Sequence, residues 1–160
     1  MPYRVPSALL VLLPLTLAAA GAADAGQRQP AAAADGDARC LALSMYWEAK
    51  DQGRDGMIAV GSVVLNRVQH HKFPDTVCGV VFEGGETPPC QFSWWCDGKS
   101  DRPTEPGPWT LARELAEEML ESPPRDPTRG ALFFHADYVK DTWIKRRTRT
   151  AQVGRHIYYR

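Results

Sequence analysis

Glu48 is the residue of this sequence best placed for acid–base chemistry. It follows two aromatic residues and ends the apolar face of a helix predicted over residues 37–49, with Asp37 as its N-terminal cap. Burial beside aromatic rings disfavours a charged carboxylate and raises its pKa. Such a carboxyl can protonate a leaving oxygen, as cleavage of a glycosidic bond requires. A shifted helix phase would instead make Glu48 a solvated neighbour of Lys50, and periodicity alone leaves both interpretations open.

Residues 90–98, with the sequence CQFSWWCDG, are the second candidate for a functional site. Two adjacent tryptophans beside amide, hydroxyl and carboxyl groups suit sugar binding. The C–H faces of a sugar lie on aromatic rings, while its hydroxyls bond to polar side chains. The alternative is that a tryptophan belongs to the core, and we expect this of at least one of the pair.

The composition is that of one folded domain. The chain has 160 residues, of which 44% are apolar and 24% charged, with 19 basic and 19 acidic side chains. This apolar fraction is enough for a buried core, which argues against a disordered chain. The balanced charge argues against a nucleic-acid-binding protein, because such proteins carry excess basic residues that neutralise phosphates.

The first 25 residues have the pattern of an export signal. Arg4 precedes an uncharged run that is broken by Pro6 and Pro14 and ends in small residues. The run is shorter than the ~20 apolar residues of a membrane-spanning helix, so we expect cleavage rather than an uncleaved anchor. Residues 26–36 have the composition of a linker, which leaves residues 37–160 as the folded domain. We therefore expect a periplasmic or secreted protein with no stable membrane span after processing.

Four cysteines, Cys40, Cys78, Cys90 and Cys96, lie in the predicted domain. Their spacing does not indicate a zinc site, and export permits disulfides, so two bridges are favoured over four buried thiols. Three pairings are formally possible. We expect Cys90 to pair with Cys96, which closes a small loop, and Cys40 to pair with Cys78, which ties two helices together.

The remaining patterns predict an α+β fold. Residues 57–68 form a long apolar run rich in β-branched residues, which would also suit a strand. Its length and the capping position of Asp55 favour a buried helix, on which Ser62 and Asn66 would form a small polar stripe beside a cleft. A short helix is expected from Thr76, an irregular excursion over 83–107, and an amphipathic helix from Pro108. Residues 131–136 and 151–159 are expected to form a small antiparallel sheet near the C-terminus.

These segments together resemble the SleB/CwlJ-type cell wall hydrolase family. The likeness covers almost the whole of residues 37–160, and several ordered motifs are more specific than any single one. The usual family motif has an arginine and a phenylalanine where this chain has Lys50 and Trp47, and both exchanges keep the residue type. The matching segments are CLAL at 40–43, YWEAK at 46–50, VLNR at 64–67, FPDTVCGVV at 73–81, CQFSWWCDG at 90–98, GA at 130–131, FHA at 134–136, Trp143, VGRH at 153–156 and YY at 158–159.

The resemblance implies a lysozyme-like catalytic domain that cuts peptidoglycan glycan strands, with Glu48 as the catalytic acid. Family members are regarded chiefly as lytic transglycosylases, which cleave between N-acetylmuramic acid and N-acetylglucosamine and leave 1,6-anhydromuramyl ends. One glutamate serves as acid and then as base, without a metal or another cofactor. Our candidates for contacts that line the cleft are Ser62, Asn66, Gln91, Ser93, Trp94, His135 and Tyr138.

Other functions remain open at this point. An inverting hydrolase would need a second carboxylate, for which Asp75 or Asp97 could serve. The family has also been described as N-acetylmuramoyl-L-alanine amidases, but the four histidines lack the spacing of a zinc site. A non-catalytic module that binds peptidoglycan is the third possibility. Because no wall-binding repeat precedes the domain, we expect targeting to depend on the domain itself or on an unidentified partner protein.

Overall fold

Two long helices, α1 (Ala31–Ala49) and α2 (Gly53–Val68), form the centre of the computed structural model, which describes residues 31–140 and 143–160. The predicted signal peptide and residues 26–30 of the predicted linker lie outside the described residues. Helix α1 begins at Ala31 rather than at Asp37, because the alanines that start it are the strongest helix formers. Asp37 therefore lies within α1 and does not cap it. Its carboxylate instead accepts a hydrogen bond from the backbone N–H of Cys78 at 3.2 Å.

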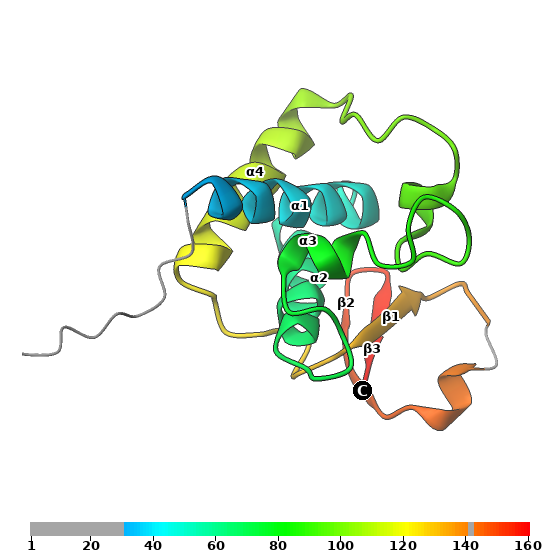
Figure 1. The fold of residues 1–160 in the computed structure, drawn as a ribbon. Coiled ribbons are helices and arrows are strands. Elements are labelled where there is room, and N and C mark those ends of the chain that lie inside the picture. The colour runs from blue at the N-terminus through cyan, green and yellow to red at the C-terminus, as the bar shows by residue number, and fades with distance from the viewer. Residues whose placement is uncertain (1–30, 141–142) are drawn as a thin grey trace, which may run out of the picture.

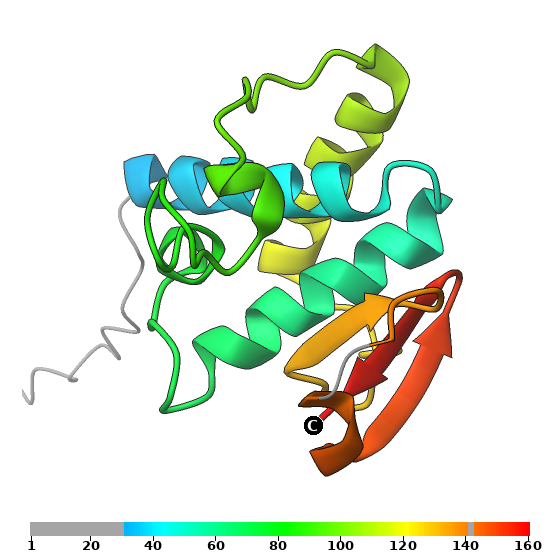
Figure 2. The same cartoon turned by 90° about the vertical axis from the view of Figure 1, so that its right-hand side faces the viewer.

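Helix α2 is buried along most of its length, as the sequence predicts. It begins at Gly53, whose φ of +66° lies in the left-handed region, and its N-cap is Gln52. Asp55 is therefore in the first helical turn and does not cap the helix. In Figure 2, α2 lies between α1 and the sheet.

Two further helices pack against this pair (Figure 1). Helix α3 (Val77–Val81) has Thr76 as its N-cap, whose hydroxyl accepts from the backbone N–H of Gly79 at 3.1 Å. Helix α4 (Pro106–Glu121) begins two residues before the predicted Pro108. Its buried face has the predicted spacing and consists of Ala112, Leu115, Ala116 and Met119.

The C-terminal part of the chain forms a three-stranded antiparallel sheet in the order β1-β3-β2. The strands are β1 (Phe133–Ala136), β2 (Arg149–Val153) and β3 (His156–Tyr159), and a short 3-10 helix η2 (Trp143–Arg146) precedes β2. The segment predicted as one extended piece over 151–159 is thus a hairpin. Its turn contains Gly154, whose φ is +54°. The predicted α+β class, with a helical core and a small sheet near the C-terminus, is confirmed.

An irregular segment between α3 and α4 covers the C-terminal end of α1 and contains the 3-10 helix η1 (Ser93–Cys96). The predicted disulfide pairing is confirmed, since Cys40–Cys78 joins α1 to α3 and Cys90–Cys96 closes the loop around η1. No helix among the described residues has the length and apolar character needed to cross a membrane.

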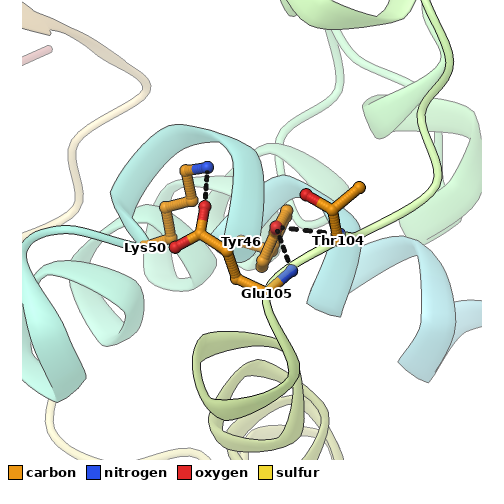
Figure 3. Close-up of polar contacts among 4 residues, drawn as sticks. All are labelled: Tyr46, Lys50, Thr104 and Glu105. Atoms are coloured by element: carbon orange, nitrogen blue, oxygen red, sulfur yellow. Dashed lines mark hydrogen bonds and ion pairs between the residues drawn. The ribbon is translucent and has the colours of Figure 1, made fainter.

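The C-terminal end of α1 holds the far end of this segment in place (Figure 3). The hydroxyl of Tyr46 accepts hydrogen bonds from the backbone N–H groups of Thr104 at 3.1 Å and Glu105 at 3.2 Å, and Lys50 forms an ion pair with Glu105. The indole N–H of Trp47 donates to the carbonyl of Asp101 at 3.3 Å. These contacts fix the segment against the helical turn that carries Glu48.

Candidate active site

A cavity of about 470 Å³ lies where the C-terminal end of α1, helix α2, strand β1 and the disulfide-closed loop meet. Glu48 comes from α1, Arg67 from α2, and the loop contributes four consecutive residues from position 90 to 93. The disulfide-closed loop therefore places polar side chains in the same cavity as Glu48. The lining residues are Glu48, Arg67, Cys90, Gln91, Phe92, Ser93, Phe134, His135 and Val139.

The Glu48 carboxyl is half-buried in this cavity, and burial raises its pKa from 4.5 to about 7. The positive charge of Arg67 and the indole N–H of Trp94 act in the opposite direction and keep the pKa from rising further. This position agrees with the desolvation expected of the carboxyl. Near neutral pH both the acid and the carboxylate are populated, as a group that must give up and take back a proton requires.

Arg67 is the residue of the site that sequence reasoning missed. It is only 2% exposed, and burial lowers its pKa to about 10, against the opposing charges of Glu83 and Glu48. Its Nε donates to the carbonyl of Leu132 at 2.8 Å. The apolar spacing from Val60 and Val64 to position 67 was a signal for it, because that spacing places the arginine on the buried face of α2.

Aromatic rings surround the Arg67 guanidinium. The centres of the Phe73, Phe92 and Phe133 rings lie 5.3, 5.6 and 5.8 Å from its central carbon. With the amide of Gln91 oriented so that its oxygen faces the guanidinium, this oxygen accepts from Nη1 at 3.2 Å and from Nη2 at 3.3 Å. Within the described part of the chain, the guanidinium therefore donates its hydrogen bonds to neutral oxygens.

The two tryptophans of the loop do not form an exposed surface on which a sugar could stack. Trp94 is 8% exposed and packs in the core, nearly parallel to Trp47 at 6.4 Å between ring centres. It does not line the cavity, and its buried indole N–H lies near enough to Glu48 to lower the pKa of that carboxyl, although no hydrogen bond of regular geometry joins them. Trp95 is half-buried and packs on Phe82 at 4.2 Å. The alternative interpretation, in which a tryptophan belongs to the core, is the correct one for Trp94.

His135 lines the cavity and is held by hydrogen bonds. Its Nδ1 lies 2.7 Å from the carbonyl oxygen of Ala136, and its Nε2 lies 2.9 Å from the hydroxyl of Tyr159. Since a carbonyl only accepts, Nδ1 carries a hydrogen. Tyr138 does not line the cavity but precedes Val139, which does, and its ring is 70% exposed.

Ser62 and Asn66 lie away from Glu48, contrary to the expectation that they line the same cleft. They line a separate cavity of about 260 Å³ between α2 and the end of α4. The Ser62 hydroxyl donates to the carbonyl of Ile58 at 2.8 Å, and the Asn66 amide donates to Asp126 at 3.0 Å. Successive helical residues point about 100° apart, so Arg67 rather than its neighbour faces the glutamate.

Among the residues that the structure describes, Glu48 is the only carboxylate that lines this cavity. Asp75 and Asp97, the candidates for a second acid, are exposed and lie outside that lining. His156 lies outside it as well, within 3.2 Å of the side-chain nitrogen of Gln52. In the described part of the chain, no group of three or more histidine, cysteine, aspartate or glutamate side chains is arranged to hold a metal ion.

Several known proteins resemble this chain in sequence and in structure. Residues 51–159 match the cell wall hydrolase family. The chain is 33% identical over 130 residues to the spore cortex-lytic enzyme of Halalkalibacterium halodurans and 32% identical over 131 residues to that of Bacillus subtilis. Each alignment covers 81% of this chain but only 36% and 39% of the respective relative.

Two solved structures have the same fold. The catalytic domain of the Bacillus cereus SleB protein matches with a TM-score of 0.61 and 31% identity, over 79% of this chain and 91% of that one. The catalytic domain of the germination-specific lytic transglycosylase SleB from Bacillus anthracis matches with a TM-score of 0.60 and 28% identity, over 78% and 93%. The match over residues 51–159 together with these relatives shows that the chain belongs to the cell wall hydrolase family.

Proposed function

We propose that this protein cleaves peptidoglycan glycan strands between N-acetylmuramic acid and N-acetylglucosamine as a lytic transglycosylase. The observation that carries the proposal is Glu48, a half-buried carboxyl with a pKa of about 7 that is the single acid among the described residues lining its cavity. The family match begins at residue 51, just after this glutamate, so its role rests on geometry. One of the similar structures is itself described as a lytic transglycosylase, which supports the same reaction.

In the first step, the protonated Glu48 gives its proton to the oxygen that bridges the two sugars. The bond between this oxygen and C1 of the muramyl residue breaks, and its electron pair stays on the oxygen, which leaves as a hydroxyl of N-acetylglucosamine. Positive charge develops on the muramyl ring, and Glu48 is now a carboxylate. Arg67 lines the same cavity, and its charge favours that ionised state.

In the second step, the Glu48 carboxylate takes the proton from the muramyl C6 hydroxyl while that oxygen attacks C1. A 1,6-anhydro sugar forms, and Glu48 is protonated again, so the cycle consumes neither water nor protons. A single carboxyl that exchanges one proton works best when its pKa is near the operating pH. An inverting hydrolase would need a second carboxylate about 6.5–9.5 Å away to activate water, and the described residues that line this cavity offer none.

Three polar residues of the cavity are the proposed substrate contacts. Gln91 and Ser93 come from the disulfide-closed loop and His135 from β1. Tyr138, which lies beside the cavity, offers an exposed ring for a further sugar. Trp94 supports the loop from the core, with its indole N–H on the side of Glu48.

We also propose that the protein is exported, with residues 1–25 as a cleaved signal peptide. Two disulfides among the described residues fit an oxidising compartment such as the periplasm or the exterior. The N-terminal sequence of the protein recovered from a periplasmic or culture fraction tests the cleavage. A start between residues 21 and 26 is expected, and recovery of the intact chain in the membrane fraction would refute it.

Digestion of purified sacculi with the Glu48→Gln variant tests the reaction. The amide keeps the size of the side chain but neither donates a proton as an acid nor takes one as a base. We expect the variant to fold and release no soluble muropeptides, whereas Glu114→Gln, at an exposed position of α4, should keep full activity. Full activity of Glu48→Gln would refute the role of this glutamate.

Mass spectrometry of the products from the unchanged protein identifies the reaction. Anhydromuramyl ends are expected from transglycosylation. Reducing ends would indicate hydrolysis, freed stem peptides an amidase, and binding without any product a non-catalytic module. Each of these three results would refute the proposed reaction.

A further inference from the structure

Arg67 is a buried cation that forms no direct ion pair among the described residues. Its Nε donates to Leu132, and its two terminal nitrogens donate to the amide oxygen of Gln91. Among the described residues, no carboxylate lies within ion-pair distance of the guanidinium. Burial of a charge with neutral partners alone is costly, and such an arrangement is more often found where the charge has a use.

The place where the charge can act is the cavity that Arg67 shares with Glu48. Both residues line it, and Arg67 is held rigidly by three aromatic rings. The guanidinium cannot turn away to solvent, because it is only 2% exposed. Its positive charge therefore stays beside the cavity and is screened little by water.

Gln91 is rigidly placed as well. Its backbone N–H donates to the carbonyl of Glu83 at 2.9 Å, and its neighbour Cys90 is bonded to Cys96. A neutral amide at this position binds the guanidinium without cancelling its charge. A carboxylate would fit the same space and bind more strongly, but it would neutralise the charge.

We propose that Arg67 is a positioning residue whose charge keeps Glu48 able to ionise inside the cavity, and that Gln91 preserves this charge by holding the guanidinium through a neutral oxygen. The inference rests on the proposed function, in which Glu48 must become a carboxylate halfway through the reaction. Burial alone favours the protonated acid that begins the first step and disfavours the carboxylate that this step leaves behind. The cation stabilises the carboxylate between the two proton transfers.

Other ionisable groups also face this pair. His135 of β1 lines the same cavity. The hydroxyl of Tyr158 in β3 interacts electrostatically with Glu48. Glu83 and Arg147 act on Arg67 with opposite signs. A test must therefore change the charge at one position and compare it with a neutral change at the same position.

Substitution of Gln91 provides that comparison. In Gln91→Glu a carboxylate replaces the amide against Arg67, and in Gln91→Met a neutral side chain of similar length removes the acceptor. The Glu48 titration is followed directly by carbon NMR of labelled carboxyl groups, with Glu48→Gln used to assign the signal. We expect Gln91→Glu to raise the midpoint by about one pH unit, since the added negative charge offsets the effect of Arg67 on the Glu48 carboxyl. Gln91→Met should move the midpoint by a few tenths of a unit at most.

Two results would overturn the inference. One is a Gln91→Glu midpoint equal to that of the unchanged protein, and the other is an equal shift in Gln91→Met, which would indicate displacement of the loop. Arg67→Met and Arg67→Lys give a second test that does not depend on position 91. The loss of charge should raise the Glu48 midpoint, whereas lysine should hold it closer to its original value. Equal midpoints in these two variants would also overturn the inference.

The titration separates this inference from the proposed function, because it needs no turnover. If the midpoints move as expected while the unchanged protein releases no anhydromuropeptides, Arg67 and Gln91 set the ionisation of Glu48 but the proposed reaction is wrong. If the protein is active, the upper limb of its pH–rate profile should move with the midpoint in Gln91→Glu. Loss of rate at every pH without such a shift would indicate a structural role only.

Discussion

The burial of Glu48 should cost the protein stability at neutral and alkaline pH, and Glu48→Gln should recover it. A carboxyl whose pKa is 4.5 in the unfolded chain and about 7 in the folded protein binds more protons when folded over that interval. The free energy of unfolding therefore falls as the pH rises through this window and stays low above it. The two pKa values are about 2.5 pH units apart, so at ~1.4 kcal/mol per unit the cost is about 3 kcal/mol at pH 7 to 8 and approaches ~3.5 kcal/mol at higher pH.

Urea unfolding at pH 4.5 and at pH 8 measures this cost. Glutamine does not titrate, so Glu48→Gln should be about 3 kcal/mol more stable than the unchanged protein at pH 8, and the difference should shrink towards pH 4.5. Glu114→Gln, at an exposed position, is the matched control and should show no such change between the two pH values. A stability difference for Glu48→Gln that is the same at both pH values would refute desolvation as the cause of the raised pKa.

Two further substitutions test the assignment of residues away from the cavity. Asn66→Leu removes the amide that donates to Asp126 and to the carbonyl of Ala131, so unfolding should become easier by ~1–3 kcal/mol while the pH–rate profile keeps its shape; a shifted profile would return Asn66 to the active site. Tyr158→Phe removes a buried hydroxyl that has no hydrogen-bond partner among the described residues, so thermal unfolding should show equal or higher stability, and a loss above ~1 kcal/mol would reveal a partner.

The features that could be predicted from the sequence are those that local patterns determine. The buried face of α4 follows from its helical spacing, and the Thr76 cap of α3 follows from its residue type. The raised pKa of Glu48 is one of two interpretations that the sequence leaves open, because a small shift in helix phase decides whether this acid faces water or the interior.

The features that could not be predicted depend on contacts between distant segments. Asp37 has a residue type suited to capping its own helix, but its carboxylate binds a backbone N–H 41 residues away. The burial of Arg67 depends on Leu132 and Gln91, which only the folded chain brings to it. Because charged residues are rarely buried, a sequence pattern favours small polar residues such as Ser62 and Asn66 as the lining of a cleft and passes over an arginine.

Glu48 lies under opposing influences whose balance fits the two tasks proposed for it. It sits in the last turn of α1, where the negative end of the helix dipole adds to the effect of burial and favours the protonated acid. Arg67 and the indole of Trp94 favour the carboxylate. Either influence alone would move the pKa away from neutrality and would impair one of the two proton transfers. Arg67 and Trp94 come from α2 and from the disulfide-closed loop. The pKa of Glu48 therefore comes close to neutrality only when the tertiary structure is complete.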